Sequence, residues 1–193
     1  MAASFVSIVN AALIELGADT ITSLTEDTKA ARIANTRLDS LLDATLRAHP
    51  WKFAIKRKEL APLVETPEYG FGYQFQLPTS SGDGHCLRLL EIENDDDLYP
   101  YRVEGRRILY DSDTLKIKFI QRVTDPTQYD SLFNEVFAAR FAVELALGLT
   151  GNRELARDMM DLYEKKLREA RFVDGTEGSQ EDLAADDWIN SRL

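Results

Sequence analysis

Few residues of this sequence have side chains suited to chemistry, and the first to consider are His85 and Cys86. A cysteine beside a histidine could form a nucleophile and base. The two are neighbours in a turn-rich stretch, whereas catalytic pairs of this kind are assembled from positions far apart in the chain. We therefore interpret both as structural. The second histidine, His49, precedes Pro50 and suits the carbonyl end of a helix.

A run of carboxylates at Asp95, Asp96 and Asp97 could bind Ca²⁺ or Mg²⁺, which prefer oxygen ligands. The ligand spacing of an EF-hand loop is absent, and acidic runs of this kind are usually solvated. The glycine pairs at 70–72 and 82–84 do not open a helix, so they indicate turns and not a phosphate-binding loop. The sequence thus predicts no metal, no cofactor and no catalytic site.

Basic residues cluster at Lys52, Lys56, Arg57 and Lys58, beside aromatic side chains. This pattern could indicate a nucleic-acid patch. The whole chain, however, has 33 acidic and 23 basic residues and a net charge of −10, which argues against binding to duplex DNA. We interpret the cluster as the exposed side of a strand or part of a protein interface.

Helical periodicity occupies both ends of the sequence. Apolar residues at three- and four-residue spacing predict helices over Ser4–Leu16 and from a capping box at Ser23–Glu26 to His49. After a cap at Asp130, the segment 131–149 has few polar positions, so it should be the central helix. A fourth helix follows a cap at Asn152 and ends at Gly175.

The middle of the chain alternates with a period of two, which is typical of strands. Such stretches start at Trp51, Tyr73, Cys86, Tyr101, Arg107 and Leu115, and they predict one small, mainly antiparallel sheet. The expected fold class is α+β: a four-helix core with a β insertion between helices 2 and 3. Its parts are helices 1–2 in residues 1–50, the insertion in 51–124, helices 3–4 in 125–175 and an extended acidic tail in 176–193.

The order of motifs resembles the phage tail tubular protein A family, also called head-to-tail connector or adaptor proteins. The likeness extends to about Asp174, and its motifs are Val9–Leu13 with Leu16-Gly17, Ile21–Leu24, His49-Pro-Trp-Lys-Phe-Ala54, Tyr73 with Leu77-Pro78, Asp83 with Cys86-Leu-Arg88, Tyr101–Arg106, Asp125-Pro126 and Tyr163–Ala170. The resemblance implies a dodecamer, a twelve-subunit ring between portal protein and tail nozzle or tube. DNA would pass through its acidic channel without specific binding, because like charges repel.

On this reading the chain is a structural subunit and not an enzyme. It is assembled in the host cytoplasm, which suits its single cysteine, and it is located in the neck of the virion, with no membrane contact. Candidate residues for portal docking are Trp188, Ile189 and Leu193. Candidate tail-side or intersubunit residues are Lys56, Arg57, Lys58 and Arg106, in the strand that ends at Lys58 and the hairpin at Gly105.

Two other functions remain open from the sequence. One is a small metal-dependent hydrolase that uses His85 and the Asp95–Asp97 run, although the sequence offers few groups that could converge in a pocket. The other is a non-viral protein-binding module that recognises its partner through the C-terminal tail.

Overall fold

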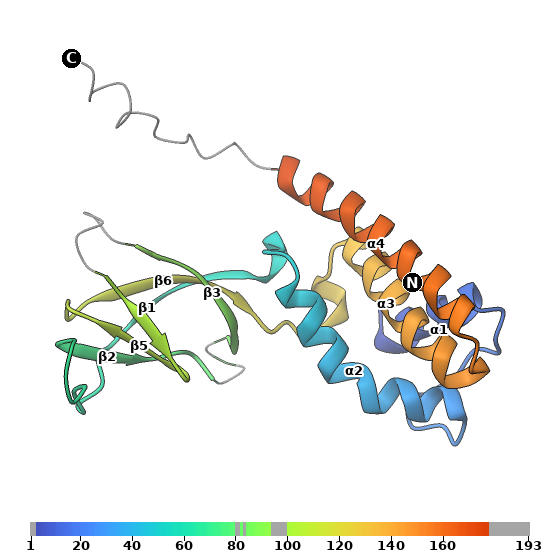
Figure 1. The fold of residues 1–193 in the computed structure, drawn as a ribbon, viewed down its shortest axis with the longest axis horizontal. Coiled ribbons are helices and arrows are strands. Elements are labelled where there is room, and N and C mark those ends of the chain that lie inside the picture. Colours follow the sequence, from blue (N-terminus) through green and yellow to red (C-terminus); the bar gives the residue numbers. More distant parts are fainter. Residues whose placement is uncertain (1–2, 80–81, 83, 94–99, 178–193) are drawn as a thin grey trace, which may run out of the picture.

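The computed structural model describes residues 3–79, 82, 84–93 and 100–177, and these form two lobes (Figure 1). The helical body consists of α1 (Phe5–Glu15), α2 (Lys29–Arg47), α3 (Ser131–Thr150) and α4 (Arg153–Thr176). The β lobe lies between α2 and α3 in sequence and projects from the helical body (Figure 1). Its strands are β1 (Ile55–Leu60), β2 (Tyr73–Gln76), β3 (Cys86–Glu93), β4 (Arg102–Glu104), β5 (Arg107–Tyr110) and β6 (Leu115–Gln121). The predicted α+β class, with a β insertion between the second and third helices, is confirmed.

The central position of α3 is also confirmed. This helix packs against α1, α2 and α4, and its phenylalanines are buried. Asp130 caps it by accepting hydrogen bonds from the backbone N–H groups of Leu132 and Phe133, at 2.8 and 3.4 Å. Gly151 ends it in the left-handed conformation, and Asn152 caps α4 in the same way as Asp130 caps α3.

The capping box predicted at Ser23–Glu26 does not start a helix, and that prediction was wrong. The Glu26 carboxylate accepts from the backbone N–H and the hydroxyl of Thr22, at 2.8 and 2.9 Å, within a loop. The second helix begins only at Lys29, where Thr28 is the N-cap and its hydroxyl accepts from the Ala31 N–H. A carboxylate and a hydroxyl at this spacing satisfy loop amides as well as helix amides, because the local hydrogen bonds are similar.

The strand predicted from Trp51 starts later than expected. Residues Lys52–Ala54 form a 3₁₀ turn (η1), and β1 begins at Ile55. The turn lets Trp51 and Phe53 both reach the helical core, where their rings stack with centroids 6.4 Å apart. Their spacing of two residues therefore came from a tight turn after Pro50 and not from a pleated strand.

The strands form two sheets and not the single sheet that the sequence predicted. Sheet A has the order β1-β6-β3 and sheet B the order β2-β5-β4, and every pair is antiparallel. Apolar side chains from both sheets make one core between them: Leu60, Phe75, Leu77, Cys86, Ile92, Ile108, Tyr110, Leu115, Ile117 and Phe119. Strand β3 also contributes Leu87 and Leu90 to the helical core, so it links the two cores.

The fourth helix continues one residue beyond the predicted end at Gly175, to Thr176. The predicted tail over 176–193 therefore starts inside α4. Residues 178–193, which include Trp188, Ile189 and Leu193, lie outside the described residues.

Candidate docking surfaces

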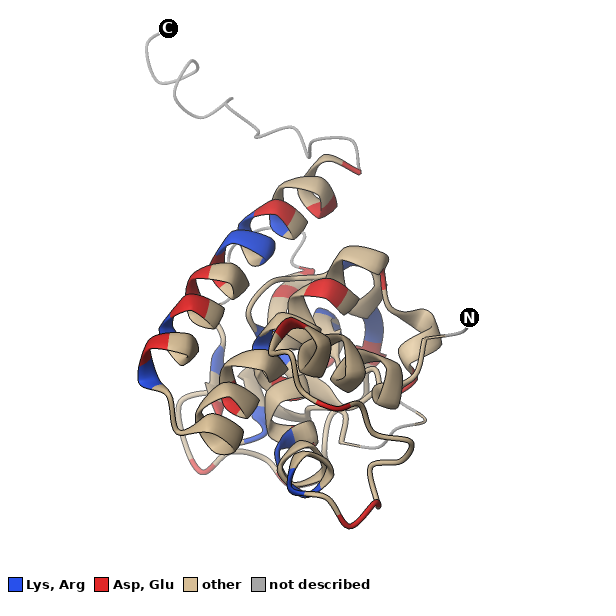
Figure 2. Cartoon of the chain, turned by 90° about the vertical axis from the view of Figure 1, so that its right-hand side faces the viewer, with Lys and Arg blue, Asp and Glu red and all other residues tan. Residues whose placement is uncertain are grey.

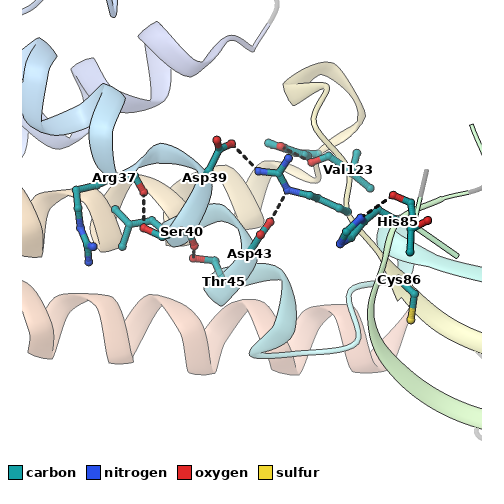
Figure 3. Close-up of polar contacts among 12 residues, drawn as sticks. Arg37, Asp39, Ser40, Asp43, Thr45, His85, Cys86 and Val123 are labelled. Carbon is teal, nitrogen blue, oxygen red and sulfur yellow. Dashed lines mark hydrogen bonds and ion pairs between the residues drawn. The ribbon is translucent and has the colours of Figure 1, made fainter. Parts of the chain in front are cut away.

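An arginine between two aspartates joins the β lobe to the helical body. Arg122, just after β6, donates to Asp39 and Asp43 of α2, each at 2.5 Å (Figure 3). Burial of the guanidinium opposes its charge, but the hydrogen bonds and the attraction of the two carboxylates outweigh burial and raise the pKa of Arg122. The bridge spans about 80 positions of sequence, so no local pattern could have revealed it. It restricts rotation of one lobe against the other.

A second set of contacts fixes the same junction on the side of α4. The His49 ring is 2.9 Å from the Asp174 carboxylate, and the other oxygen of Asp174 accepts from the Lys52 backbone N–H at 3.1 Å. Trp51 donates its indole N–H to the Thr45 carbonyl at 3.0 Å and meets Phe133 edge to face. The α2–β1 corner is therefore fixed by buried aromatic packing and by α4, and the two lobes form one unit.

The basic residues proposed as an interface do not share one face. Arg57 lies opposite Lys118 of β6, whereas Lys56 lies opposite Phe119. Because directly opposed residues project to the same side of a sheet, Arg57 points away from the core between the sheets and Lys56 lies on the core side, as does Lys58. An aliphatic stem with a charged head on the inner side of an edge strand is a usual protection against strand addition.

The outer face of sheet A is a ladder of opposite charges. Lys118 pairs with Glu91 at 3.1 Å, and Lys116 with Glu93 at 3.3 Å. A shallow groove of about 330 Å³ runs over this ladder and is also lined by Arg57. The charges largely neutralise one another, so this face is a weak candidate for binding an anion such as the DNA backbone.

Arg106, the fourth candidate, lies in the hairpin between β4 and β5. Gly105 adopts a positive φ of 59°, as a two-residue hairpin turn requires. The Arg106 guanidinium turns back and donates to the carbonyls of Pro78 and Cys86, at 3.0 and 3.1 Å. It therefore fixes the hairpin against the start of β3, and its first role is to position the β4 edge.

An apolar row on sheet B reaches that edge, although it was not predicted from the sequence. Phe75 opposes Ile108, and Ile108 opposes Val103. The first two are fully buried, but Val103 is 46% exposed, and Tyr101, just before β4, is 43% exposed. Among the described residues, no strand pairs with the outer side of β4. The spacing of Tyr101 and Val103, two residues apart before a glycine turn, was the available signal, but only the register shows that their row continues the buried core.

His85 and Cys86 do not form a catalytic pair in the structure. Their side chains point away from each other (Figure 3), and the His85 Nδ1 lies 3.0 Å from the Thr79 carbonyl oxygen. Cys86 is buried in the core between the sheets. Burial raises the pKa of its thiol, and the positive charges of Arg106 and Arg47 offset this only in part.

We therefore expect Cys86 to be inert toward thiol reagents in the native protein. At neutral pH its reaction with an aromatic disulfide should be about 100-fold slower than in urea, because the reagent needs a thiolate that it can reach. The measurement is the absorbance of the released thiol with and without denaturant. Equal rates in the two conditions would contradict the burial of Cys86.

The remaining sequence candidate is the carboxylate run that was considered as a metal site. Asp95, Asp96 and Asp97 lie outside the described residues. Within the part of the chain that is described, no three His, Cys, Asp or Glu side chains gather as metal ligands would. Over the same residues, no helix has both the length and the apolar composition to cross a bilayer.

Comparison of the sequence with models of protein families gave no match, and comparison with curated proteins gave none either. What the chain does must therefore be argued from its own fold and surfaces.

Proposed function

We propose that this protein is a head-to-tail adaptor of a tailed bacteriophage. It is a structural subunit of the virion neck. Copies close into a ring between portal protein and tail, around a channel through which DNA passes. A closed ring needs two different surfaces on each copy, one for each neighbour.

The observation that carries this proposal is the β4 edge, which no strand of the described chain covers, on a rigidly mounted lobe. The apolar row through Phe75, Ile108 and Val103 starts in the core between the sheets and ends at a half-exposed side chain. An adjacent copy that covers Val103 and Tyr101 would extend the core already present between the sheets. Arg122 and Trp51 hold the lobe at one angle to the helical body, and a constant angle is what lets successive copies close.

The charge of the chain fits a channel. At a net charge of −10 per copy, a ring would surround the DNA with like charge, and repulsion would oppose adhesion of the duplex. On this proposal Trp188, Ile189 and Leu193 of the C-terminal segment provide the aromatic and apolar anchors for the portal.

The test is native mass spectrometry of the protein mixed with the portal protein encoded beside it, compared with each protein alone. The expected result is a complex with as many adaptor copies as the portal ring has subunits, since one closed symmetry fixes both numbers. Failure to associate at micromolar concentrations would contradict the adaptor role. A monomer in the absence of the portal would not, because the ring can require the portal as its template.

A further inference from the structure

Three arginines from separate elements converge on the C-terminal end of α2. Arg47, on α2 itself, donates to the Leu87 carbonyl of β3. Arg88 of β3 approaches the Arg47 carbonyl at 3.5 Å, and Arg171 of α4 donates to the Ala48 carbonyl at 2.6 Å. Carbonyls at the end of a helix lack intrahelical partners and carry partial negative charge, which explains why Arg88 and Arg171 turn toward the Arg47 and Ala48 carbonyls, while Arg47 itself reaches across to β3. We call these three residues the arginine cluster.

The positive charge of this cluster is not neutralised within the described residues. Arg37, Arg107 and Arg122 each pair with a carboxylate, whereas the hydrogen bonds just described from the three cluster arginines to the rest of the described chain all go to main-chain carbonyls. All three are exposed, and each guanidinium has further N–H donors. Asp174, the carboxylate that contacts the α2–β1 corner, is already paired with His49 and the Lys52 N–H. An acidic protein therefore places three exposed arginines around the end of α2, at the junction of its lobes.

The fourth helix brings the following segment of the chain to this surface. Asp174, in its last turn, contacts the α2–β1 corner, and α4 ends at Thr176. Residues 178–193 contain four carboxylates, Glu181, Asp182, Asp186 and Asp187, against one arginine, a net charge of −3. Along α4, basic and acidic residues alternate (Figure 2), and Lys166 pairs with Glu15 and Glu135.

We propose that residues 178–193 bind in cis to the arginine cluster through their carboxylates. Five extended residues reach about 17 Å, whereas Arg171 lies five helical residues, about 7.5 Å, before Thr176, so Glu181 can reach back to Arg171. A tether this short gives a high effective concentration, which favours the same chain over a second copy. Guanidinium groups bind carboxylates by paired hydrogen bonds.

A partner can displace the docked segment from the arginine cluster, so the contact can regulate when the segment is available. Exposed Arg–carboxylate pairs are individually weak, so the docked segment depends on several pairs and on its tether. A partner that binds Trp188 and Ile189 in an apolar pocket can displace it. The cluster then acts as a holder that keeps the segment away from other surfaces until that partner arrives. The contact lies within one chain, so it does not rest on the adaptor role.

The test uses acrylamide quenching of tryptophan fluorescence in the full chain. Trp51 is 1% exposed and contributes little quenching, so the signal reports Trp188. The decisive variant is E181Q/D182N/D186N/D187N, which leaves the folded part unchanged. Its quenching constant should rise about twofold, because a released aromatic side chain loses its cover. About 0.5 M NaCl, which shortens the Debye length to about 4 Å, should have the same effect on the unmodified protein.

The reciprocal variant R47E/R88E/R171E should also raise the quenching constant. Its control is R153E/R157E, which reverses two exposed charges at the start of α4 and should leave the constant unchanged. Circular dichroism establishes that each variant is folded. Equal quenching of the neutralised segment and the unmodified protein would overturn the proposal. A quenching constant that changes with protein concentration would also overturn it, since docking would then be between copies.

Discussion

Replacing Trp51 by alanine is expected to lower the free energy of unfolding by about 3–5 kcal/mol, the range for large aromatic side chains removed from a core. Trp51 is 1% exposed, its ring meets Phe133 at 5.1 Å, and its N–H is bonded to Thr45. The cavity would open at the corner where the chain leaves the helical body, so both lobes should lose support. The measurement is urea unfolding followed by circular dichroism, or a melting temperature lower by about 10 °C.

Two companion variants show which property of Trp51 matters. Trp51→Phe keeps much of the packing but removes the N–H donor, so it should cost less than alanine. Phe172→Ala removes an aromatic residue of similar size that is 73% exposed on α4, and it should change stability by less than about 0.5 kcal/mol. A Trp51→Ala variant that loses no more stability than Phe172→Ala would show that the corner is not a buried core.

Local patterns were sufficient where the burial of one segment decides its structure. The segment 131–149 is apolar on nearly all sides, so only a central helix could bury it, and the caps at Asp130 and Asn152 were readable from residue type. The alternation of Leu115, Ile117 and Phe119 likewise identified β6, now the middle strand of sheet A.

Local patterns gave wrong predictions where the same residues are suited to two different local structures. Ser23 and Glu26 satisfy a loop as easily as a helix start, and only the packing of α2 decides between them. The spacing of Trp51 and Phe53 suits either a strand or a 3₁₀ turn. The chain adopts the turn because both rings then gain burial against the helical core.

The candidate surfaces depend on contacts between distant residues, which explains why the sequence could not supply them. Arg57 and Lys56 are neighbours in the chain but lie on opposite faces once β1 pairs with β6. Arg106 was expected at an interface because it belongs to the hairpin at Gly105, yet its partners, Pro78 and the first residue of β3, Cys86, lie 28 and 20 residues away in the chain. Likewise, only the register of Val103 with Ile108 shows that Val103 extends a buried apolar row.

Replacing Val103 by lysine is expected to abolish the proposed ring while leaving the subunit folded. Val103 is half exposed on a short edge strand, where a lysine stem can lie along the sheet, so stability should change by less than about 0.5 kcal/mol. At the proposed contact, however, the lysine places a charge against apolar surface, and each 1.4 kcal/mol lost weakens one interface about tenfold. A closed ring repeats this loss at every interface, so a modest local cost prevents closure.

The matched control is Glu104→Gln, which changes the net charge by the same amount at the adjacent residue of β4. Glu104 opposes Arg107, so it lies on the other face of sheet B from Val103. With portal present, native mass spectrometry should show the full copy number for Glu104→Gln and at most single subunits for Val103→Lys. Loss of the ring in both variants would attribute assembly to the charge of β4. A complete ring with Val103→Lys would exclude the apolar row as the contact between copies, because a lysine buried there without a partner could not be tolerated at every interface.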